Sequence, residues 1–141
     1  MYLLDTDIII YSLKANEIVK QNLRLHINDP IKISAATLME LYYGAYKSQK
    51  VESNLAKVKT IESVLEIIPI NQELTEIFGL LKSNLEKAGN PLDDFDLILA
   101  ATALSHNLIL VTNNEKHFKR IEGLKMENWS EKSNEPDGSQ V

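Results

Sequence analysis

Short apolar runs with strand character alternate with helical segments along this chain, and that alternation constrains its fold more than any other feature. The runs lie at 2–4, 31–34, 67–70, 108–111 and 124–126, and most of them are rich in Ile, Leu and Val. Segments with helical character separate them, at 8–13, 17–27, 37–46, 51–66, 73–87 and 95–104. Strands that alternate with helices pair in parallel through crossover connections, so we expect an α/β fold with a parallel sheet.

Length and composition indicate one cytoplasmic domain. A chain of 141 residues fits a single core, and 44% hydrophobic with 25% charged residues is ordinary for a soluble protein. Asp5 and Asp7 interrupt the apolar N-terminal run, so we expect neither a signal peptide nor a membrane span. The absence of cysteine excludes disulfides and thiolate zinc sites.

The polar residues at 130–141 predict a disordered tail after a domain at 1–129.

Three acids occupy positions where the surrounding sequence is apolar. Asp5 ends the first strand-like run, Asp96 opens the mostly apolar stretch 97–104, and Glu40 lies within the apolar stretch 38–42. An ionised carboxylate is costly to bury unless it is paired, hydrogen-bonded or bound to a cation. No Lys or Arg stands beside any of the three in the sequence, so they indicate a metal site.

Helix capping is the structural interpretation of the acids near 5 and 94. Asp5, or with better spacing Asp7, would cap the helix that follows, and Asp93 or Asp94 would cap the next apolar helix. One acid satisfies each cap, and several acids in a few residues repel each other unless something positive is near. The additional acids therefore favour a functional site, with Asp96 held nearest the sheet.

Glu40 has its own structural interpretation. Thr37-x-x-Glu40 is a capping-box pattern, in which the Glu side chain bonds back to the backbone of the cap. A capping Glu normally faces solvent, whereas the neighbours of Glu40 leave no polar helix face. We therefore interpret Glu40 as a site residue.

Small polar residues follow the strand-like run at 108–111. Thr112, Asn113 and Asn114 are ordinary loop residues in one interpretation. If this strand lies near the first one, however, Asn114 stands beside Asp5 at the sheet edge where parallel sheets bind ligands.

The balance of charges leaves the substrate open. A net charge of −5 argues against nucleic-acid binding, but a metal ion bound to several acids reverses the local field. Lys116, His117, Lys119 and Arg120 form a basic cluster that is either a solvated face or a phosphate contact. His106 and His117 are interpreted as surface residues, and an oxygen-lined site favours Mg²⁺ or Mn²⁺ over zinc.

Four motifs occur in a characteristic order: LLDTDI at 3–8, SAATLMELYYG at 34–44, DLILAATAL at 96–104 and LVTNN at 110–114. FKRIEGL at 118–124 and ENW at 127–129 follow them. Together they resemble the motifs of PIN-domain ribonucleases, specifically the VapC toxins of type II toxin–antitoxin systems. The resemblance covers residues 1–129.

The resemblance implies a PIN-like three-layer α/β/α sandwich with a central parallel sheet of four to five strands. It implies that Asp5, Glu40 and Asp96 are catalytic acids that bind the metal, and that Asn114 takes the fourth catalytic position. Relatives often carry Asp at that fourth position and usually carry Asn where this chain has Asp7.

The function implied by the resemblance is that of a toxin that cleaves RNA phosphodiester bonds as a Mg²⁺- or Mn²⁺-dependent endoribonuclease. Related toxins often cut transfer RNA. The expected partners are a VapB-like antitoxin that covers the acidic cleft, the RNA substrate, and a second copy of the chain in a homodimer.

Two other functions compete with this one. Asp5-Thr6-Asp7 after a strand also resembles the nucleophile motif of haloacid-dehalogenase-like phosphatases, although that mechanism has no use for Glu40. A non-catalytic interaction domain, whose acids bind only a structural ion, is the second alternative. Metal-dependent RNA cleavage separates the three.

Overall fold

A parallel sheet of five strands forms the centre of the computed structural model, which describes residues 1–131. The strands are β1 (Tyr2–Leu4), β2 (Ile31–Ser34), β3 (Glu66–Ile68), β4 (Ile109–Val111) and β5 (Met126–Glu127), in the spatial order β3-β2-β1-β4-β5. Every neighbouring pair is parallel, with Leu3 opposite Lys32 on one side and Leu110 on the other. The predicted α/β class is therefore confirmed.

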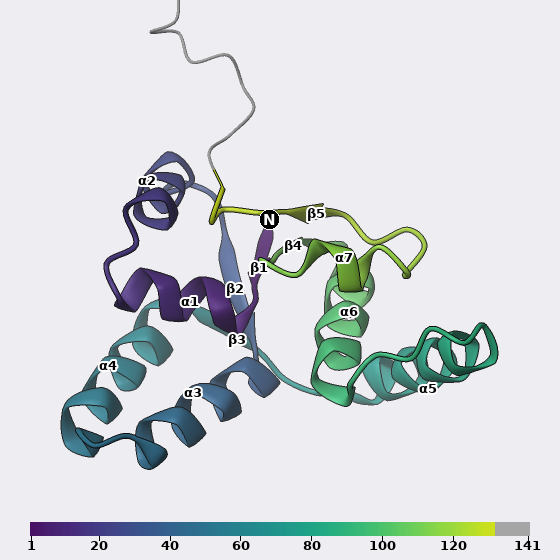
Figure 1. The fold of residues 1–141 in the computed structure, drawn as a ribbon, viewed down its shortest axis with the longest axis horizontal. Helices are drawn as coiled ribbons and strands as arrows, with labels where there is room; N and C mark the ends of the chain where they lie inside the picture. The colour runs from purple at the N-terminus through teal and green to yellow at the C-terminus, as the bar shows by residue number, and fades with distance from the viewer. Residues whose placement is uncertain (132–141) are drawn as a thin grey trace, which may run out of the picture.

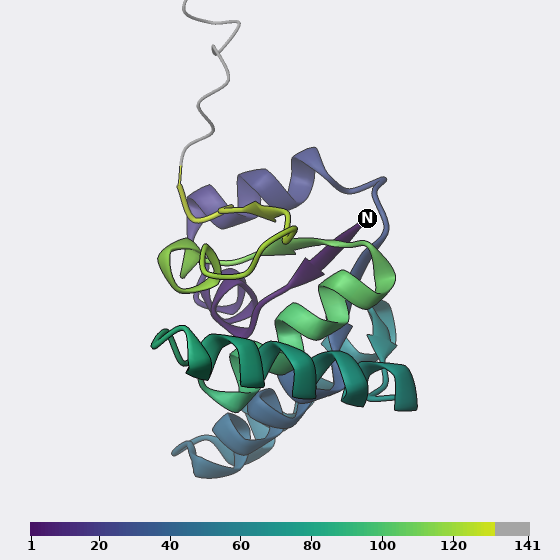
Figure 2. The ribbon, with the colours of Figure 1, turned by 90° about the vertical axis from the view of Figure 1, so that its right-hand side faces the viewer.

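Helices cover both faces of the sheet (Figure 1). One face carries α1 (Thr6–Leu13), α2 (Glu17–Leu25), α3 (Ala35–Lys47) and α4 (Val51–Val64). The other carries α5 (Gln72–Lys87), α6 (Asp94–His106) and the short α7 (Glu115–Phe118). Figure 2 shows α5 and α6 side by side on this second face. Within residues 1–131, no helix is both long and apolar enough to cross a bilayer.

Each face of the sheet has its own hydrophobic core, because successive side chains of a strand point to opposite sides. Leu3 is fully buried in the core beneath α5 and α6, together with Leu97 and Phe118. Its neighbour Leu4 faces the other way, into the core formed with Ile8 of α1. Since β1 is buried on both faces, the chain that leaves it is held firmly where Asp5 begins the next element.

Capping side chains move two helix starts away from the predicted positions. α1 begins at Thr6 and not at Ile8, because Asp5 is the N-cap; the prediction that Asp7 caps this helix is wrong. α3 begins at Ala35 and not at 37, because Ser34 is its N-cap and its Oγ accepts a hydrogen bond of 3.1 Å from the Ala36 backbone N.

Several other boundaries differ by a few residues. β3 is an edge strand that ends at Ile68, just before Pro69, whose missing N–H makes it unsuitable inside a sheet. β5 lies at Met126–Glu127 instead of 124–126, after a turn in which Gly123 adopts a positive φ of 81°. α2 and α4 end at Leu25 and Val64, two residues before their predicted ends.

The segment after β5 returns across the helical face that carries α2. Trp129 is buried, and its indole stacks on the His26 ring with centroids 4.3 Å apart. The Asn22 amide donates a hydrogen bond of 2.9 Å to the Trp129 carbonyl oxygen. Residues 132–141, most of the tail predicted to be disordered, lie outside the described residues.

Candidate active site

Asp5 lies at the carboxyl edge of the sheet, directly after the central strand β1. Its backbone N donates a 2.9 Å hydrogen bond to the Val111 carbonyl oxygen at the end of β4. Its Oδ1 accepts a hydrogen bond of 2.7 Å from the Thr6 backbone N, and its Oδ2 accepts one of 2.8 Å from the Thr112 hydroxyl. The carboxylate is therefore buried but hydrogen-bonded, which holds it in a fixed position.

Glu40 reaches the same edge from α3. Its Oε1 accepts a hydrogen bond of 2.9 Å from the Thr6 hydroxyl, so a single threonine contacts both Asp5 and Glu40. The capping-box interpretation of Glu40 is excluded, because Ser34 caps α3 and Thr37 lies buried inside the helix. The expectation of an apolar, buried surrounding is only partly right: Met39 is 52% exposed.

Asp96 comes from the first turn of α6, which begins at the same sheet edge. The N-cap is Asp93, whose Oδ1 accepts a hydrogen bond of 2.9 Å from the Asp96 backbone N. This confirms the prediction that Asp93 or Asp94 caps the helix. Asp94 is exposed and pairs with Lys82 at 2.9 Å, and it does not line the cavity described below.

Asn114 lies after β4 and contacts Asp7 directly. Its Nδ2 donates a hydrogen bond of 3.3 Å to Asp7 Oδ2, and its backbone N donates one of 3.0 Å to the Thr112 hydroxyl oxygen. The prediction that Asn114 and Asp5 share a sheet edge holds, because β1 and β4 are neighbours. Thr112, not Asn114, is the residue that contacts the Asp5 carboxylate.

A cavity of about 300 Å³ brings the predicted residues together. It is lined by Asp5, Thr6, Asp7, Glu40, Asp93, Phe95, Asp96, Asn114 and His117. All four predicted catalytic residues are in this set. Sequence reasoning missed Thr6 and Phe95. Of the predicted basic cluster, only His117 lines the cavity, and it is exposed as predicted.

Burial and mutual repulsion make these carboxyl groups weaker acids than usual. Burial raises the pKa of Asp5 to about 6, with the Asp7 charge adding to the shift and the Thr112 hydrogen bond opposing it. Burial, followed by the charges of Asp93 and Asp5, raises the pKa of Asp96 to about 7. The pKa of Glu40 is raised in the same way by burial.

Among the described residues, no Lys or Arg lines the cavity to relieve this repulsion. The ion pairs among residues 1–131 join Arg24 to Glu17, Lys32 to Glu66 and Lys82 to Asp94, and none includes a cavity acid. Within the same residues, no three His, Asp or Glu side chains are already gathered as ion ligands. Carboxylates that share a cavity without a counter-charge repel each other, which keeps their side chains separated. Their oxygens are the ligand atoms that hard divalent cations prefer.

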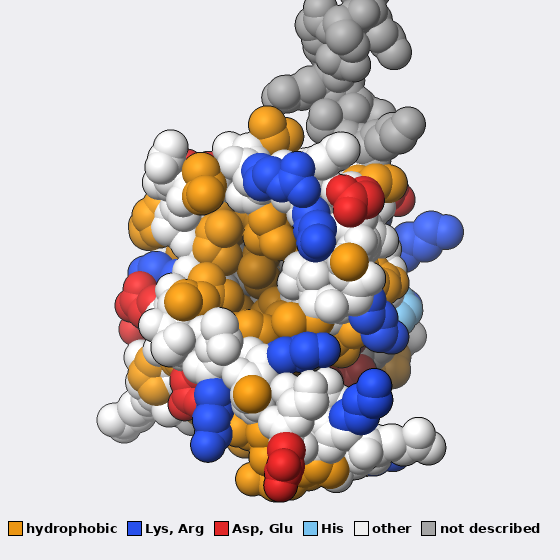
Figure 3. All heavy atoms as spheres, turned by 90° about the vertical axis from the view of Figure 1, so that its left-hand side faces the viewer, with side chains coloured by type: hydrophobic (Ala, Val, Ile, Leu, Met, Phe, Trp, Pro, Cys, Tyr) orange, Lys and Arg blue, Asp and Glu red, His pale blue; other side chains and the backbone are white. Residues whose placement is uncertain are grey.

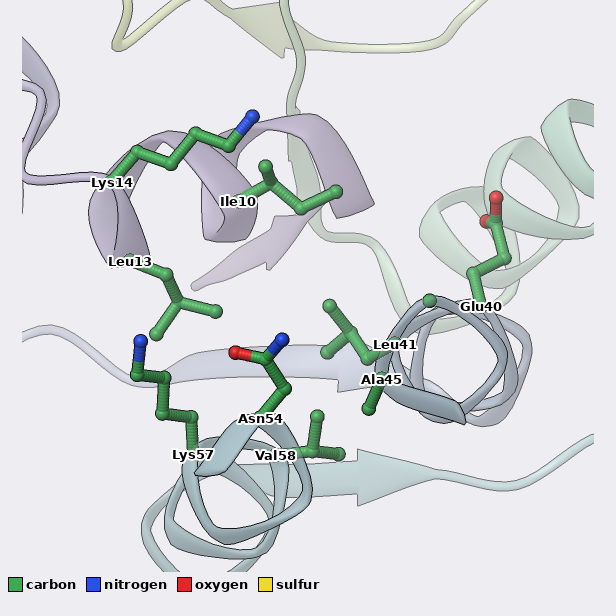
Figure 4. Close-up of a pocket in the computed structure, with 10 residues that line it drawn as sticks. Ile10, Leu13, Lys14, Glu40, Leu41, Ala45, Asn54, Lys57 and Val58 are labelled. Carbon is green, nitrogen blue, oxygen red and sulfur yellow. The ribbon is translucent and has the colours of Figure 1, made fainter. Parts of the chain in front are cut away.

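A second hollow, which we call the groove, lies between α1, α3 and α4. It has a volume of about 270 Å³, with an apolar floor that includes Ile10, Leu13, Leu41, Ala45 and Val58. Lys14, Asn54 and Lys57 stand around this floor, and Figure 4 shows Glu40 at the end contributed by α3. In the space-filling view of this side, apolar side chains occupy the hollow and basic side chains stand around it (Figure 3). Glu40 lines both the groove and the acidic cavity.

Comparison with known proteins identifies the family to which this chain belongs. The sequence matches the PIN domain family over residues 2–124. It is 42% identical to ribonuclease VapC2 of Rickettsia felis over 131 residues, which are 92% of this chain and 98% of that protein. It is 38% identical to the tRNA(fMet)-specific endonuclease VapC of Shigella flexneri over 130 residues, with coverage of 92% and 98%.

Solved structures of VapBC proteins have the same fold as this chain. The fold superposes on VapBC2 of Rickettsia felis, crystallised with a promoter DNA fragment, with a TM-score of 0.85 at 41% identity, covering 91% of this chain and 98% of that one. DNA-bound VapBC of Salmonella typhimurium gives a TM-score of 0.84 at 36% identity, with coverage of 91% and 97%. The chain therefore belongs to the PIN-domain family, and within it to the VapC ribonuclease toxins.

Family membership also confirms the three-layer fold expected from the motifs. Membership of the VapC ribonucleases does not favour either alternative function, the haloacid-dehalogenase-like phosphatase or the non-catalytic interaction domain.

Proposed function

We propose that this chain is a metal-dependent endoribonuclease in which Asp5, Glu40 and Asp96 bind Mg²⁺ or Mn²⁺ and Asn114 completes the site. The observation that carries the proposal is the acidic cavity. The carboxylate that follows β1 meets those from α3 and α6 at one sheet edge, and no Lys or Arg among the described residues lines the cavity or pairs with them. Such a cavity repels a phosphodiester unless divalent ions reverse its field.

A bound ion would supply an activated water and would stabilise the charge that develops on the phosphate. The protein fixes where this can happen. Thr6 and Thr112 hold the carboxylates of Glu40 and Asp5 by hydrogen bonds of 2.9 and 2.8 Å, so neither side chain must be ordered when the substrate arrives. The acids act as ligands in this proposal, and cleavage leaves a 5′-phosphate on the product, as the family resemblance implies.

The test compares two variants that each remove one negative charge from the start of α6. Asp96→Asn changes a cavity residue, whereas Asp94→Asn changes an exposed acid that pairs with Lys82 outside the cavity. Each purified protein is incubated with total RNA in Mg²⁺, in Mn²⁺ and in EDTA, and the fragments are sequenced. We expect discrete, EDTA-sensitive cleavage by the wild type and Asp94→Asn, and a loss of at least about a hundredfold in Asp96→Asn.

Full cleavage by folded Asp96→Asn, or undiminished cleavage in EDTA, would contradict the metal-site assignment. Cleavage that is confined to transfer RNA would place the substrate with that of the Shigella relative, whose name specifies tRNA(fMet).

We further propose that a VapB-like antitoxin is the partner of this chain in the cytoplasm and that it occupies the groove. The two relatives of known structure described above, from Rickettsia felis and Salmonella typhimurium, were solved as VapBC complexes. The apolar floor suits one face of an amphipathic helix, and Lys14 and Lys57 suit acidic side chains beside that face. Because Glu40 ends the groove and also lines the cavity, a partner seated there lies beside the catalytic acids.

Two leucines offer a matched test of this partner site. Leu13 lines the groove and is 39% exposed, whereas Leu25 on α2 is 74% exposed and lies outside it. The antitoxin encoded beside the gene is co-expressed with each variant, and the complex is recovered through a tag on the antitoxin. We expect Leu13→Asp to reduce recovery at least about tenfold and Leu25→Asp to leave it unchanged. Equal recovery of both variants would rule out the groove as the antitoxin site.

A further inference from the structure

Asp7 is an acid of the cavity for which the sequence predicted only a capping role, and the structure gives that role to Asp5. It lies in the first turn of α1, two residues after Asp5, and it is half-buried. An acid in a first helical turn is favoured by the helix dipole, which gives Asp7 a purely structural interpretation. Its contacts, however, point into the cavity and across to another element.

The partner of Asp7 is the side-chain amide of Asn114. The hydrogen bond of 3.3 Å runs from Asn114 Nδ2 to Asp7 Oδ2 and connects α1 with the loop after β4. Asn114 is itself fixed, because its backbone N donates to the Thr112 hydroxyl oxygen at 3.0 Å. That hydroxyl in turn donates to Asp5 Oδ2 at 2.8 Å, so one chain of hydrogen bonds links Asp7 to Asp5.

The carboxylate of Asp7 is also without an ion-pair partner in the described part of the chain. None of the ion pairs among residues 1–131 includes it. Asp7 lines the same cavity as Asp5 and Glu40, so its negative charge adds to theirs. Asn114, by contrast, brings no charge to the position that completes the site.

We propose that Asp7 supplies the fourth negative charge of the ion site, and that Asn114 serves mainly to hold the Asp7 carboxylate toward the cavity. Carboxylate and amide are partners in one hydrogen bond, so their positions are interchangeable: a chain with Asn at 7 and Asp at 114 keeps both the charge and the bond. This inference rests on the proposed metal dependence and assigns the charge to a specific residue.

The test measures Mn²⁺ binding by titration calorimetry, without RNA, for four proteins. They are the wild type, Asp7→Asn, the exchanged double variant Asp7→Asn/Asn114→Asp, and Asp94→Asn as a control that removes one charge outside the cavity. We expect Asp7→Asn to weaken Mn²⁺ binding about tenfold or more, because one anion near a divalent cation is lost. The double variant should return to within about threefold of the wild type, and Asp94→Asn should stay within about twofold.

Thermal unfolding in EDTA checks that each variant is folded and measures what the helix dipole contributes. If folded Asp7→Asn binds Mn²⁺ as tightly as the wild type, or if the double variant binds as weakly as Asp7→Asn, the inference is overturned while metal dependence stands. If the wild type itself binds no Mn²⁺, both the inference and the proposed metal dependence fail.

Discussion

Thr6 and Thr112 are the residues that make the acidic cavity compatible with a folded chain. Each hydroxyl donates to a carboxylate, Thr6 to Glu40 and Thr112 to Asp5, and these bonds favour the charged forms against the effect of burial. No sequence motif marks either threonine as a site residue. Their role follows from the short connections after β1 and β4, which leave both hydroxyls at the sheet edge.

The raised pKa values predict that the metal-free protein loses stability as the pH rises. Between the ordinary Asp pKa of 3.8 and the folded values of about 6 for Asp5 and about 7 for Asp96, the native state binds more protons than the unfolded state. The free energy of unfolding therefore falls across this window and levels off above it. One pKa unit corresponds to about 1.4 kcal/mol, and solvent reduces the share of half-exposed Asp96, so we expect a fall of about 2 kcal/mol from about pH 5 to about pH 8.

Urea unfolding in EDTA at a series of pH values measures this fall. Asp96→Asn should show a shallower dependence than the wild type, because one of the acids with a raised pKa is gone. A stability that rises from about pH 5 to about pH 8 would contradict the electrostatic description of the cavity.

At the scale of elements, α3 shows what sequence patterns predict well and where they fail. Its existence and apolar character were predictable, and so was the arrival of Glu40 at the site. Its start was not, because Ser34 and Thr37 are both good caps in sequence, and only the structure shows that the helix follows Ser34, the last residue of β2, without a connecting loop. The same holds for Asp5 and Asp7 at the start of α1.

The rest of the site needed three-dimensional information for a similar reason. Asp5, Glu40 and Asp96 stand out because they are acids in apolar surroundings. Phe95 and His117 have ordinary local surroundings, and only the juxtaposition of α6 and α7 at one cavity gives them a place in it. Spacing within one element is visible in a sequence, whereas contacts between elements are not.

The interior of α3 also offers a stability prediction. The Thr37 hydroxyl is fully buried and has no hydrogen-bond partner within the described residues. Thr37→Val keeps the shape and removes an unsatisfied polar group, so we expect a gain of about 1 kcal/mol in the free energy of unfolding. Urea unfolding followed by circular dichroism measures it.

Thr102 on α6 is the matched control for this substitution. It is equally buried, but its hydroxyl donates a hydrogen bond of 2.7 Å to the Ile98 carbonyl oxygen. Thr102→Val therefore gains less than Thr37→Val or loses stability. Destabilisation by Thr37→Val would mean that its hydroxyl has a partner.

At the scale of the whole molecule, the outer side of α3 presents an apolar stripe to solvent. Met39, Tyr43 and Tyr46 are 52%, 65% and 65% exposed, and their spacing places them on one side of the helix. Exposed apolar stripes of this kind mark interaction surfaces. We propose that this stripe forms the homodimer interface.

Light scattering on the purified chain tests the dimer. The wild type should have twice the mass of the monomer, and Tyr43→Lys should shift the protein toward the monomer at the same concentration, while Leu25→Lys on α2 should not. A monomeric wild type, or a dimer that is unaffected by Tyr43→Lys, would exclude this interface.

Glu40 belongs to both hollows of the molecule, and this sharing has a thermodynamic consequence. A ligand of the groove that repositions Glu40 changes the free energy of ion binding in the cavity, and the ion must change the affinity of that ligand by the same factor. An antitoxin in the groove and a metal ion in the cavity would then be heterotropic effectors of each other. The affinity for the antitoxin would depend on the free divalent-ion concentration, even where the two ligands never touch.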